Sequence, residues 1–292
     1  MKKFIIITVI LLLSAAALLG FGVALLSKSA LLSVFLSLAP TDNVMLETNV
    51  LILGLDNVYG SRSDTIMVLH TDPKNNSASI VSIPRDTLAA IPGRGLDKIN
   101  HAYAFGGVDL SRQAVEGLLN IKIPYYLTVN LAGISKIIDD LGGLNIDVEK
   151  RMYYTDVGGN LYVDLYPGYQ KLSGREVMGY LRYRADGGDF KRIDRQQKFL
   201  NSLAQEMLKR NNLLRSPKIF FTLLSHVNSN LNSRETLGLS LAMRSAFELG
   251  QIRMTTVPGS DLMVDGIYYW RPDKDALNTI REQYIQAKRR IS

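Results

Sequence analysis

The sequence predicts an α/β protein, an α/β/α sandwich with a central mixed sheet, preceded by one N-terminal transmembrane helix. Three observations lead to this prediction. The chain opens with a long uncharged apolar run. After this run, short apolar segments typical of strands alternate with segments of helical periodicity, which is the pattern of a sheet covered by helices. The rest of the chain contains no proline- or serine-rich linker, so we expect it to form one domain.

Composition limits the class of protein. The chain has 292 residues, of which 47% are hydrophobic and 21% charged, enough for a sizeable core and too apolar for disorder. Its net charge is +7, but Lys2, Lys3 and Lys28 precede the first acidic residue, and without these three the surplus is four. So small a surplus gives no indication of nucleic-acid binding. The absence of cysteine excludes disulfides, thiolate catalysis and Cys-ligated zinc.

The apolar run from Phe4 to Leu26 has no charge in 23 residues, long enough to cross about 30 Å of hydrocarbon as a helix. Lys2 and Lys3 favour a cytoplasmic N-terminus. A cleaved signal peptide is the alternative, since three alanines at 15–17 resemble a cleavage site, but the run continues beyond them. We therefore predict a single-pass protein of the cell membrane. Residues 1–41 would form a cytoplasmic stub, the anchor and a juxtamembrane segment, and residues 42–292 an extracellular domain.

Three strands are predicted at the start of this domain. Asn49 to Leu55 is typical of a buried strand, and Thr65 to Thr71 and Ala78 to Pro84 follow as two more. The turn-forming residues 72–76, DPKNN, join the second strand to the third. We therefore expect the three to be neighbours in the sheet.

Helices and strands alternate through the middle of the chain. Helical patterns occur at Lys98–Phe105, Asp109–Leu119 and Leu131–Leu141, and strands are predicted at Tyr125–Asn130 and Leu144–Val148. Gly142 and Gly143 are expected to end the third helix. Residues 151–170 are rich in tyrosine and glycine and suggest a loop or hairpin.

The C-terminal half begins with a capping box, SGRE at 173–176, which should open a short helix leading to Arg182. A longer helix is predicted from Asp189 to about Arg210. Further helices are predicted at Ile219–Leu231 and Glu235–Leu249, a strand at Ile252–Gly259, and a hairpin turn at Asp265-Gly266.

Four arginines, Arg182, Arg184, Arg192 and Arg195, lie within one turn and the start of one helix. Guanidinium groups this close repel one another unless an anion lies between them. Arginine presents five N–H donors in a planar fork that matches phosphate oxygens. The cluster therefore suggests an arginine cage for a phosphate or pyrophosphate. The alternative is an ordinary solvated charge run.

The periodicity of the predicted helix favours the cage. At about 100° per residue, Asp189, Arg192 and Gln196 fall on one face together with apolar residues. Those apolar residues are Leu200, Leu203 and Met207. The opposite face carries Lys191, Asp194, Lys198 and Asn201. Arg192 is therefore on the wrong side for a solvated charge, and a pocket on that side would explain its position.

Two further groups of polar residues lie at predicted strand ends. Asp56 comes just after the first strand, and Arg62 and Asp64 come just before the second. Arg85 and Asp86 follow the third strand. In open α/β sheets ligands bind at such ends, and two carboxylates can share Mg²⁺ with substrate phosphates. Each group alone has a plainer interpretation, as a turn former or a surface ion pair. Together with the arginines they predict a Mg²⁺-dependent site for phosphoryl transfer.

Several short motifs follow the predicted anchor in a set order. They are GLD at 54–56, RSDTIMV at 62–68, SIPRDT at 82–87, KINHAYAFGG at 98–107, RYR at 182–184 and GDFKRIDRQQ at 188–197. In this combination the region from Asn49 to Met207 resembles the LytR-CpsA-Psr family of cell-wall glycopolymer ligases. The resemblance implies an α/β/α fold that binds an undecaprenyl-pyrophosphate-linked glycopolymer, a teichoic acid or a capsular or secondary wall polysaccharide. It also implies transfer of the phospho-glycopolymer to a peptidoglycan hydroxyl, which leaves the lipid monophosphate.

The resemblance also implies roles for individual residues. Mg²⁺ would be held by Asp56 and Asp64. The pyrophosphate would be bound by Arg62, Arg85, Lys98, Arg182, Arg184, Arg192 and Gln196, with Asp189 orienting the arginines. Asp64, Arg85 and Arg192 would be catalytic. Asp64 is also a candidate base for the attacking hydroxyl, a role that tight metal ligation opposes, and both roles stay open. A tunnel for the prenyl chain is implied too, but periodicity does not separate its lining from ordinary core.

Two other functions remain as alternatives. A polyprenyl-pyrophosphate phosphatase needs the same arginine cage but uses water as the acceptor. A non-enzymatic protein that binds wall polymer or regulates its synthesis would keep the fold and need neither Mg²⁺ nor the paired aspartates. Direct DNA binding is disfavoured, because only the first few residues are expected in the cytoplasm and the remaining net charge is small.

Overall fold

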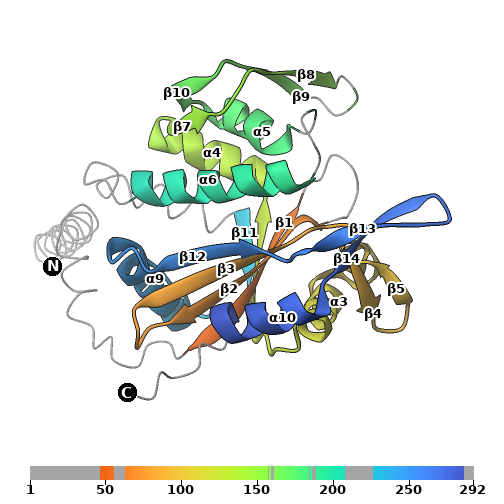
Figure 1. Ribbon diagram of the computed structural model, residues 1–292. Helices are drawn as coiled ribbons and strands as arrows, with labels where there is room; N and C mark the ends of the chain where they lie inside the picture. The colour runs from red at the N-terminus through yellow and green to blue at the C-terminus, as the bar shows by residue number, and fades with distance from the viewer. Residues whose placement is uncertain are drawn as a thin grey trace, which may run out of the picture. The chain divides into compact units, whose positions relative to one another are not determined.

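A computed structural model describes residues 47–55, 63–156, 158, 161–183, 185, 189–207 and 226–285, which Figure 1 draws in colour. Their centre is a six-stranded mixed sheet. From one edge to the other, its strands are β11 (Val227–Ser229), β6 (Tyr125–Asn130), β1 (Thr48–Leu55), β2 (Ser63–Asp72), β3 (Ser77–Ile83) and β12 (Ile252–Thr256). Neighbours among β1, β2 and β3 are antiparallel, while β6 runs parallel to β1 and β12 parallel to β3. The predicted mixed sheet, with the first three strands adjacent, is therefore confirmed.

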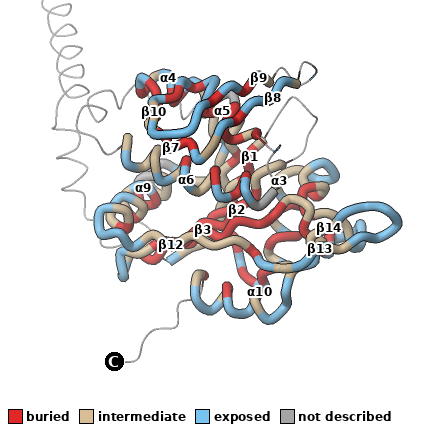
Figure 2. Tube along the Cα trace, turned by 45° about the horizontal axis from the view of Figure 1, so that its top comes forward, coloured by how far each residue is buried: buried red, intermediate tan, exposed pale blue. Residues whose placement is uncertain are grey.

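Strand β1 is apolar after its first two residues, Thr48 and Asn49, because both of its faces are covered. Successive side chains in a strand point to opposite faces, so Leu51 and Leu53 pack on one side of the sheet and Val50 and Ile52 on the other. The first side is covered by α3 (His101–Leu119) and α10 (Lys274–Ile280), which a π-helical turn, η1 (Arg281–Ile285), extends. The second side is covered by α6 (Asp189–Met207) and α9 (Ser233–Glu248). Figure 2 shows the result, since the tube of β2 and β3 is buried along most of its length.

A second apolar core lies on the other side of α6. It is built by α4 (Leu131–Leu141) and α5 (Gly174–Arg182) with two small antiparallel pairs, β7 (Leu144–Val148) with β10 (Gly168–Leu172) and β8 (Met152–Asp156) with β9 (Leu161–Leu165). This core buries Ile138, Leu144 and Val177, and Phe199 enters it from α6. In Figure 1, α4 and α5 lie beyond α6 as seen from the central sheet. Helix α6 therefore has apolar partners on two sides.

The middle of the chain follows the prediction closely. β6 and α4 coincide with the predicted strand and helix, and Gly142 and Gly143 adopt positive φ angles where α4 ends. The predicted capping box at Ser173 is present and opens α5. The two helical patterns before β6 form one helix, α3, which is broken at Gly106 and Gly107, where Gly107 has a φ of 61°. Only a residue without a side chain adopts that backbone angle easily.

Three parts of the prediction differ from the structure. Lys98 does not begin a helix, because it ends strand β5 (Gly95–Lys98), which pairs with β4 (Leu88–Ile91). The helix predicted at Ile219–Leu231 is wrong at its C-terminal end, where residues 227–229 form β11 and pair with the free edge of β6. The hairpin turn at Asp265-Gly266 is confirmed, but the strand before it, β13 (Gly259–Val264), was not predicted as the partner of β14 (Ile267–Pro272).

The predicted anchor, Phe4 to Leu26, and the boundary at residue 42 lie outside the described residues. Within the described ranges, no helix combines the length and the apolar character that crossing a bilayer requires. The membrane anchor therefore stays a prediction from the sequence.

Candidate active site

A cavity of about 250 Å³ lies between α6 and the central sheet. Its floor is a row of residues that the strand register places side by side. Val227 of β11 pairs with Val129 of β6, Val129 with Gly54 of β1, and Gly54 with Thr65 of β2. The next row adds Ile52, paired with Met67. Residues from four strands therefore share one surface.

The walls of the cavity are apolar. They come from α4, α5 and α6 and consist of Ile134, Ile137, Ile138, Leu181, Phe199, Leu200 and Leu203. Gly54 allows the close approach of Thr65 from the neighbouring strand, because a Cβ atom there would lie 2.8 Å from the Cβ of Thr65. The interior of the cavity therefore suits an apolar group.

The remaining lining residues are polar, and they are Asp64, Thr65, Arg182, Arg192 and Gln196. Arg192 is only 3% exposed, and its Nη2 donates to the backbone carbonyl of Asp64 at 3.0 Å. One helical turn later, Nε2 of Gln196 donates to Oγ1 of Thr65 at 2.9 Å. Arg182 is the last residue of α5, whose start is set by the capping box at Ser173. The cavity thus combines a cationic, hydrogen-bonding end with an apolar interior.

The inward face of α6 agrees with the helical periodicity. Arg192, Leu200 and Leu203 line the cavity, while Lys191 and Asp194 are exposed on the opposite face. The apolar residues of this face pack against the sheet. Arg192 lies on the same face, so its side chain also points inward. The predicted pocket on this side of the helix is confirmed.

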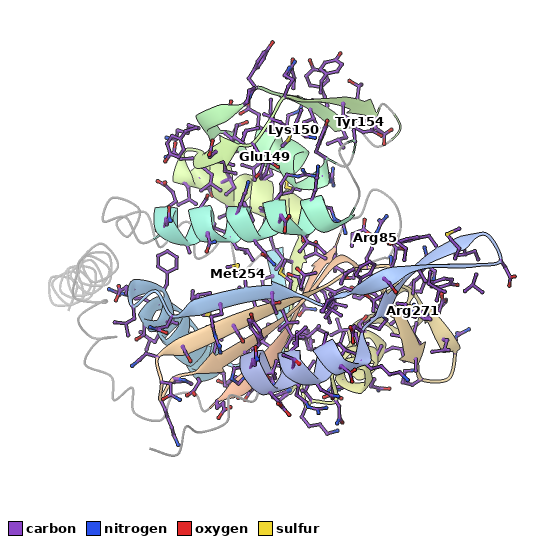
Figure 3. All side chains as sticks on the ribbon, in the orientation of Figure 1. Arg85, Glu149, Lys150, Tyr154, Met254 and Arg271 are labelled. Carbon is purple, nitrogen blue, oxygen red and sulfur yellow. The ribbon has the colours of Figure 1, made fainter. Side chains whose placement is uncertain are left out.

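A chain of charged groups joins Asp64 to the loop after β3. Nη1 of Arg85 lies 3.1 Å from Oδ1 of Asp64, and Nε of the same guanidinium lies 3.4 Å from Oδ2 of Asp86. Nζ of Lys98 then contacts Oδ1 of Asp86 at 2.8 Å. The side chains are 15–25% exposed, so solvent screens these contacts only in part. Figure 3 labels Arg85, which lies near the edge of the sheet where β2 begins and β3 ends.

The structure therefore brings five of the predicted site residues together: Asp64, Arg85, Arg182, Arg192 and Gln196. Lys98 lies one step further away, against Asp86. Asp189 begins α6, as predicted. Asp56, Arg62 and Arg184 lie outside the described part of the chain. Thr65, which the prediction did not include, holds Gln196 in place, and Asp86, which it placed after the third strand without a role of its own, holds Arg85.

Arg195 differs from Arg182 and Arg192, because it is fully buried and lines no part of the cavity. Its Nη1 lies 3.4 Å from Oε1 of Glu149, and its Nη2 donates to the carbonyl of Tyr183. The hydroxyl of Tyr180 donates to Oε2 of Glu149 at 3.1 Å. Burial raises the pKa of Tyr180, and the Glu149 carboxylate raises it further, so the hydroxyl stays protonated. The prediction that all four arginines form the cage was therefore wrong for Arg195, whose charge is neutralised within the fold.

We expect Glu149→Ala to lower the free energy of unfolding by about 3–5 kcal/mol, since it leaves the Arg195 guanidinium buried without its carboxylate. Urea denaturation followed by circular dichroism measures this change. Lys198→Ala is the matched control. Its Nζ lies 3.7 Å from the same carboxylate, but its side chain is 54% exposed, so its removal should cost less than about 1 kcal/mol. Equal stability of the Glu149→Ala variant and the unmodified chain would contradict the assignment.

One group at the cavity, the carboxylate of Asp64, is a suitable ligand for Mg²⁺. Within the described ranges, no three His, Asp or Glu side chains gather closely enough to hold a metal ion by themselves. Asp64 does place a partly exposed carboxylate at the polar end of the cavity. Mg²⁺ commonly takes one or two carboxylates together with water and substrate phosphates. A site completed by the substrate is therefore compatible with these residues.

Comparison with known proteins identifies close relatives. The LytR_cpsA_psr family model matches residues 36–286. The chain is 32% identical over 243 residues to the polyisoprenyl-teichoic acid–peptidoglycan teichoic acid transferase TagU of Enterococcus faecalis, covering 80% of this chain and 78% of the relative. It is 38% identical over 217 residues to the regulatory protein MsrR of Staphylococcus aureus, covering 72% of this chain but slightly less than two thirds of MsrR, 64%.

Two solved structures have the same fold. Bacillus subtilis TagV superposes with a TM-score of 0.72 at 31% identity, covering 82% of this chain and 98% of TagV. TagT bound to LIIa-WTA superposes with a TM-score of 0.68 at 26% identity, covering 82% of this chain and 90% of TagT.

Proposed function

The chain belongs to the LytR-CpsA-Psr family, and from that premise we propose that it moves a phospho-glycopolymer from an undecaprenyl-pyrophosphate-linked donor to a hydroxyl of peptidoglycan. The observation that carries the proposal is the cavity, which is cationic at one end and apolar inside. A prenyl pyrophosphate has an anionic pyrophosphate, which would bind at the cationic end, and an apolar prenyl chain, which would lie in the apolar interior. The relatives support the class of reaction, since TagU is named as a teichoic acid transferase with peptidoglycan as acceptor.

The lining of the cavity indicates which part of the donor it would hold. Its apolar walls would surround the prenyl units next to the pyrophosphate. The pyrophosphate would then lie between Arg182 and Arg192, within reach of Gln196.

The charged groups at the polar end would act on the reacting phosphate. A new bond forms between the acceptor oxygen and the phosphorus next to the sugar, and the bond between that phosphorus and the bridging oxygen breaks. The bridging oxygen leaves with the lipid as its monophosphate. Arginine donors fixed in advance, such as Arg192 on the Asp64 carbonyl, stabilise the charge that builds up during this step. The proton of the acceptor hydroxyl would pass to the carboxylate of Asp64 or to solvent.

We also propose that the reaction depends on Mg²⁺. Asp64 would hold the ion, together with Asp56. When bound, Mg²⁺ supplies positive charge to the phosphate oxygens. Arg85 would keep the Asp64 carboxylate oriented through their 3.1 Å contact, and Lys98 would hold Asp86 in the same network.

The predicted anchor gives the reaction its place. A single-pass helix at Phe4 to Leu26, with the N-terminus in the cytoplasm, would put the catalytic domain outside the cell and next to the membrane. The donor is a membrane lipid and the acceptor lies in the wall, so both substrates would meet the enzyme there. A protease-protection assay on intact cells tests this orientation, and protection of the C-terminal domain would contradict it.

The test of the function is a transfer assay with the full-length chain in detergent. A lipid-linked teichoic acid precursor is supplied with or without peptidoglycan fragments. We expect polymer to become attached to the fragments and lipid monophosphate to be released only when they are present. Equal release of monophosphate without peptidoglycan would show a pyrophosphate phosphatase instead. Donor binding without any product would show a binding or regulatory protein.

A further inference from the structure

Exposed tyrosines are concentrated on and next to the β8–β9 hairpin, which packs on α5. Five of the fourteen tyrosines in the chain lie on or next to β8, β9 and β10. Their exposed fractions are 62% for Tyr153, 40% for Tyr154, 50% for Tyr162, 63% for Tyr166 and 75% for Tyr169. Large aromatic side chains gathered at a surface commonly mark a binding site.

The register of the hairpin puts several of these residues on one outward face. Tyr153 lies opposite Asp164, and Thr155 opposite Tyr162, so all four side chains point to the same side. The rings of Tyr153 and Tyr162 are 6.5 Å apart and nearly perpendicular, at 83°. The other side of the hairpin carries the buried Met152, Val163 and Leu165 together with the partly exposed Tyr154, and Val163 packs on α5. The hairpin thus has one mainly buried face, which packs within the fold, and one face toward solvent that carries Tyr153 and Tyr162.

Arg151 lies beside this face and forms an ion pair with the one carboxylate on it, that of Asp164. Its guanidinium lies 4.0 Å from the ring centre of Tyr166 and 5.7 Å from that of Tyr153. We call the outward surface made by Arg151, Tyr153, Thr155, Tyr162, Asp164 and Tyr166 the tyrosine face. Because its cation and its anion neutralise each other, the face offers rings and hydrogen-bonding groups rather than net charge.

A hollow of about 290 Å³ adjoins the tyrosine face, between β9 and the start of α5. Tyr162 and Asp164 belong to both the hollow and the face, and Arg175 and Glu176 of α5 form the other wall. These two side chains also have opposite charges. Along α5, Arg175 is about 10 Å from Arg182 at the cavity, from the rise of 1.5 Å per residue. Tyr154 and Arg85, both labelled in Figure 3, lie toward the same end of α6.

We propose that the tyrosine face and its hollow bind an uncharged glycan strand, namely the sugar chain of the acceptor. The C–H groups on the flat side of a pyranose ring stack on aromatic rings, whose faces carry partial negative charge. Sugar hydroxyl and amide groups bond to paired carboxylates and guanidinium groups at the edges of the rings. An anionic phosphate polymer would need unneutralised cations, which the Arg151–Asp164 pair does not provide. This inference rests on the proposed function and names where the second substrate docks.

The test measures binding of chitohexaose, an uncharged strand of N-acetylglucosamine, to the full-length chain by isothermal titration calorimetry. We expect the double variant Tyr153→Ala, Tyr162→Ala to bind it at least about tenfold more weakly, because two ring contacts are lost. The double variant Tyr153→Phe, Tyr162→Phe keeps the rings and should keep most of the affinity. Tyr268→Ala, an exposed tyrosine on the separate hairpin β13–β14, is the matched control and should bind like the unmodified chain.

Two results would overturn the inference: no saturable binding of chitohexaose, or equal binding by the unmodified chain and the Tyr→Ala double variant. Transfer assays separate this inference from the proposed function. If the unmodified chain transfers polymer and the double variant has the same KM for peptidoglycan fragments, the tyrosine face is not the acceptor site, although the function stands. If glycan binds through the tyrosines and no transfer occurs, the docking site stands and the proposed function fails.

Discussion

Arg192→Ala is expected to lower the rate of glycopolymer transfer about 10²- to 10³-fold, the usual effect of removing one preorganised donor from a developing negative charge. Arg192 is the arginine most enclosed by the cavity, being 3% exposed, and its Nη2 is already held by the Asp64 carbonyl. Its removal therefore takes away a positive charge that is held in place at the polar end of the cavity. The initial rate of polymer attachment to peptidoglycan fragments measures the effect.

Two comparisons make the Arg192 result specific. Lys191→Ala removes a cation from the adjacent, exposed position of α6 and should leave the rate unchanged. Arg192→Lys keeps the charge but loses the planar fork that can hold two phosphate oxygens at once, so an intermediate rate is expected. Thermal unfolding confirms that each variant is folded. A folded Arg192→Ala variant with an undiminished rate would rule out the arginine cage.

Asp64→Asn should lower the rate by about 10²- to 10⁴-fold, because the amide can neither accept a proton nor bind a metal ion as a carboxylate does. The substitution preserves the size of the side chain but removes the ion pair with Arg85 at 3.1 Å. The rate is measured against Mg²⁺ concentration and against pH. Removal of divalent ions from the unmodified chain with EDTA should abolish transfer, and added Mg²⁺ should restore it.

The dependence of the rate on Mg²⁺ concentration and on pH distinguishes the two roles proposed for Asp64, metal ligand and general base. If Asp64 is a metal ligand, the Asn variant needs more Mg²⁺ for half-maximal rate and recovers part of its activity at high concentration. If Asp64 is the base, added Mg²⁺ gives no recovery and the acidic limb of the pH profile disappears. Asp194→Asn, on the exposed face of α6, is the control for loss of a carboxylate. A full rate at ordinary Mg²⁺ concentration would exclude both roles.

Much of the fold could be predicted because local patterns decide it. β6 and α4 match their predicted limits, since an alternating apolar segment is followed directly by a strongly amphipathic one and then by two glycines. The inward position of Arg192 also follows from local sequence, because the apolar residues two and three turns later, Leu200 and Leu203, fix which face of α6 is buried. Helical periodicity therefore predicts one side of the candidate site.

The rest depends on contacts between distant segments, which local patterns do not contain. Residues 227–229 become a strand only because β6 offers them an open edge. Ile52 and Met67 line the cavity because the register of β1 and β2 aligns them. Arg195 differs from Arg192 because it pairs with Glu149, which lies 46 positions earlier in the chain, and does not line the cavity. In each case the residue type is compatible with several roles, and contacts with distant segments of the chain decide which role it takes.

The row of residues under the cavity has a consequence for biosynthesis. Val227, Val129 and Gly54 meet across three neighbouring strands although they are far apart along the chain. Contacts of such long sequence separation form late, after the loops between them have closed. A ribosome delivers β1 first and β11 much later. A nascent chain that ends before residue 227 therefore has no finished pocket, and the protein should become able to capture a lipid substrate only near the end of its synthesis.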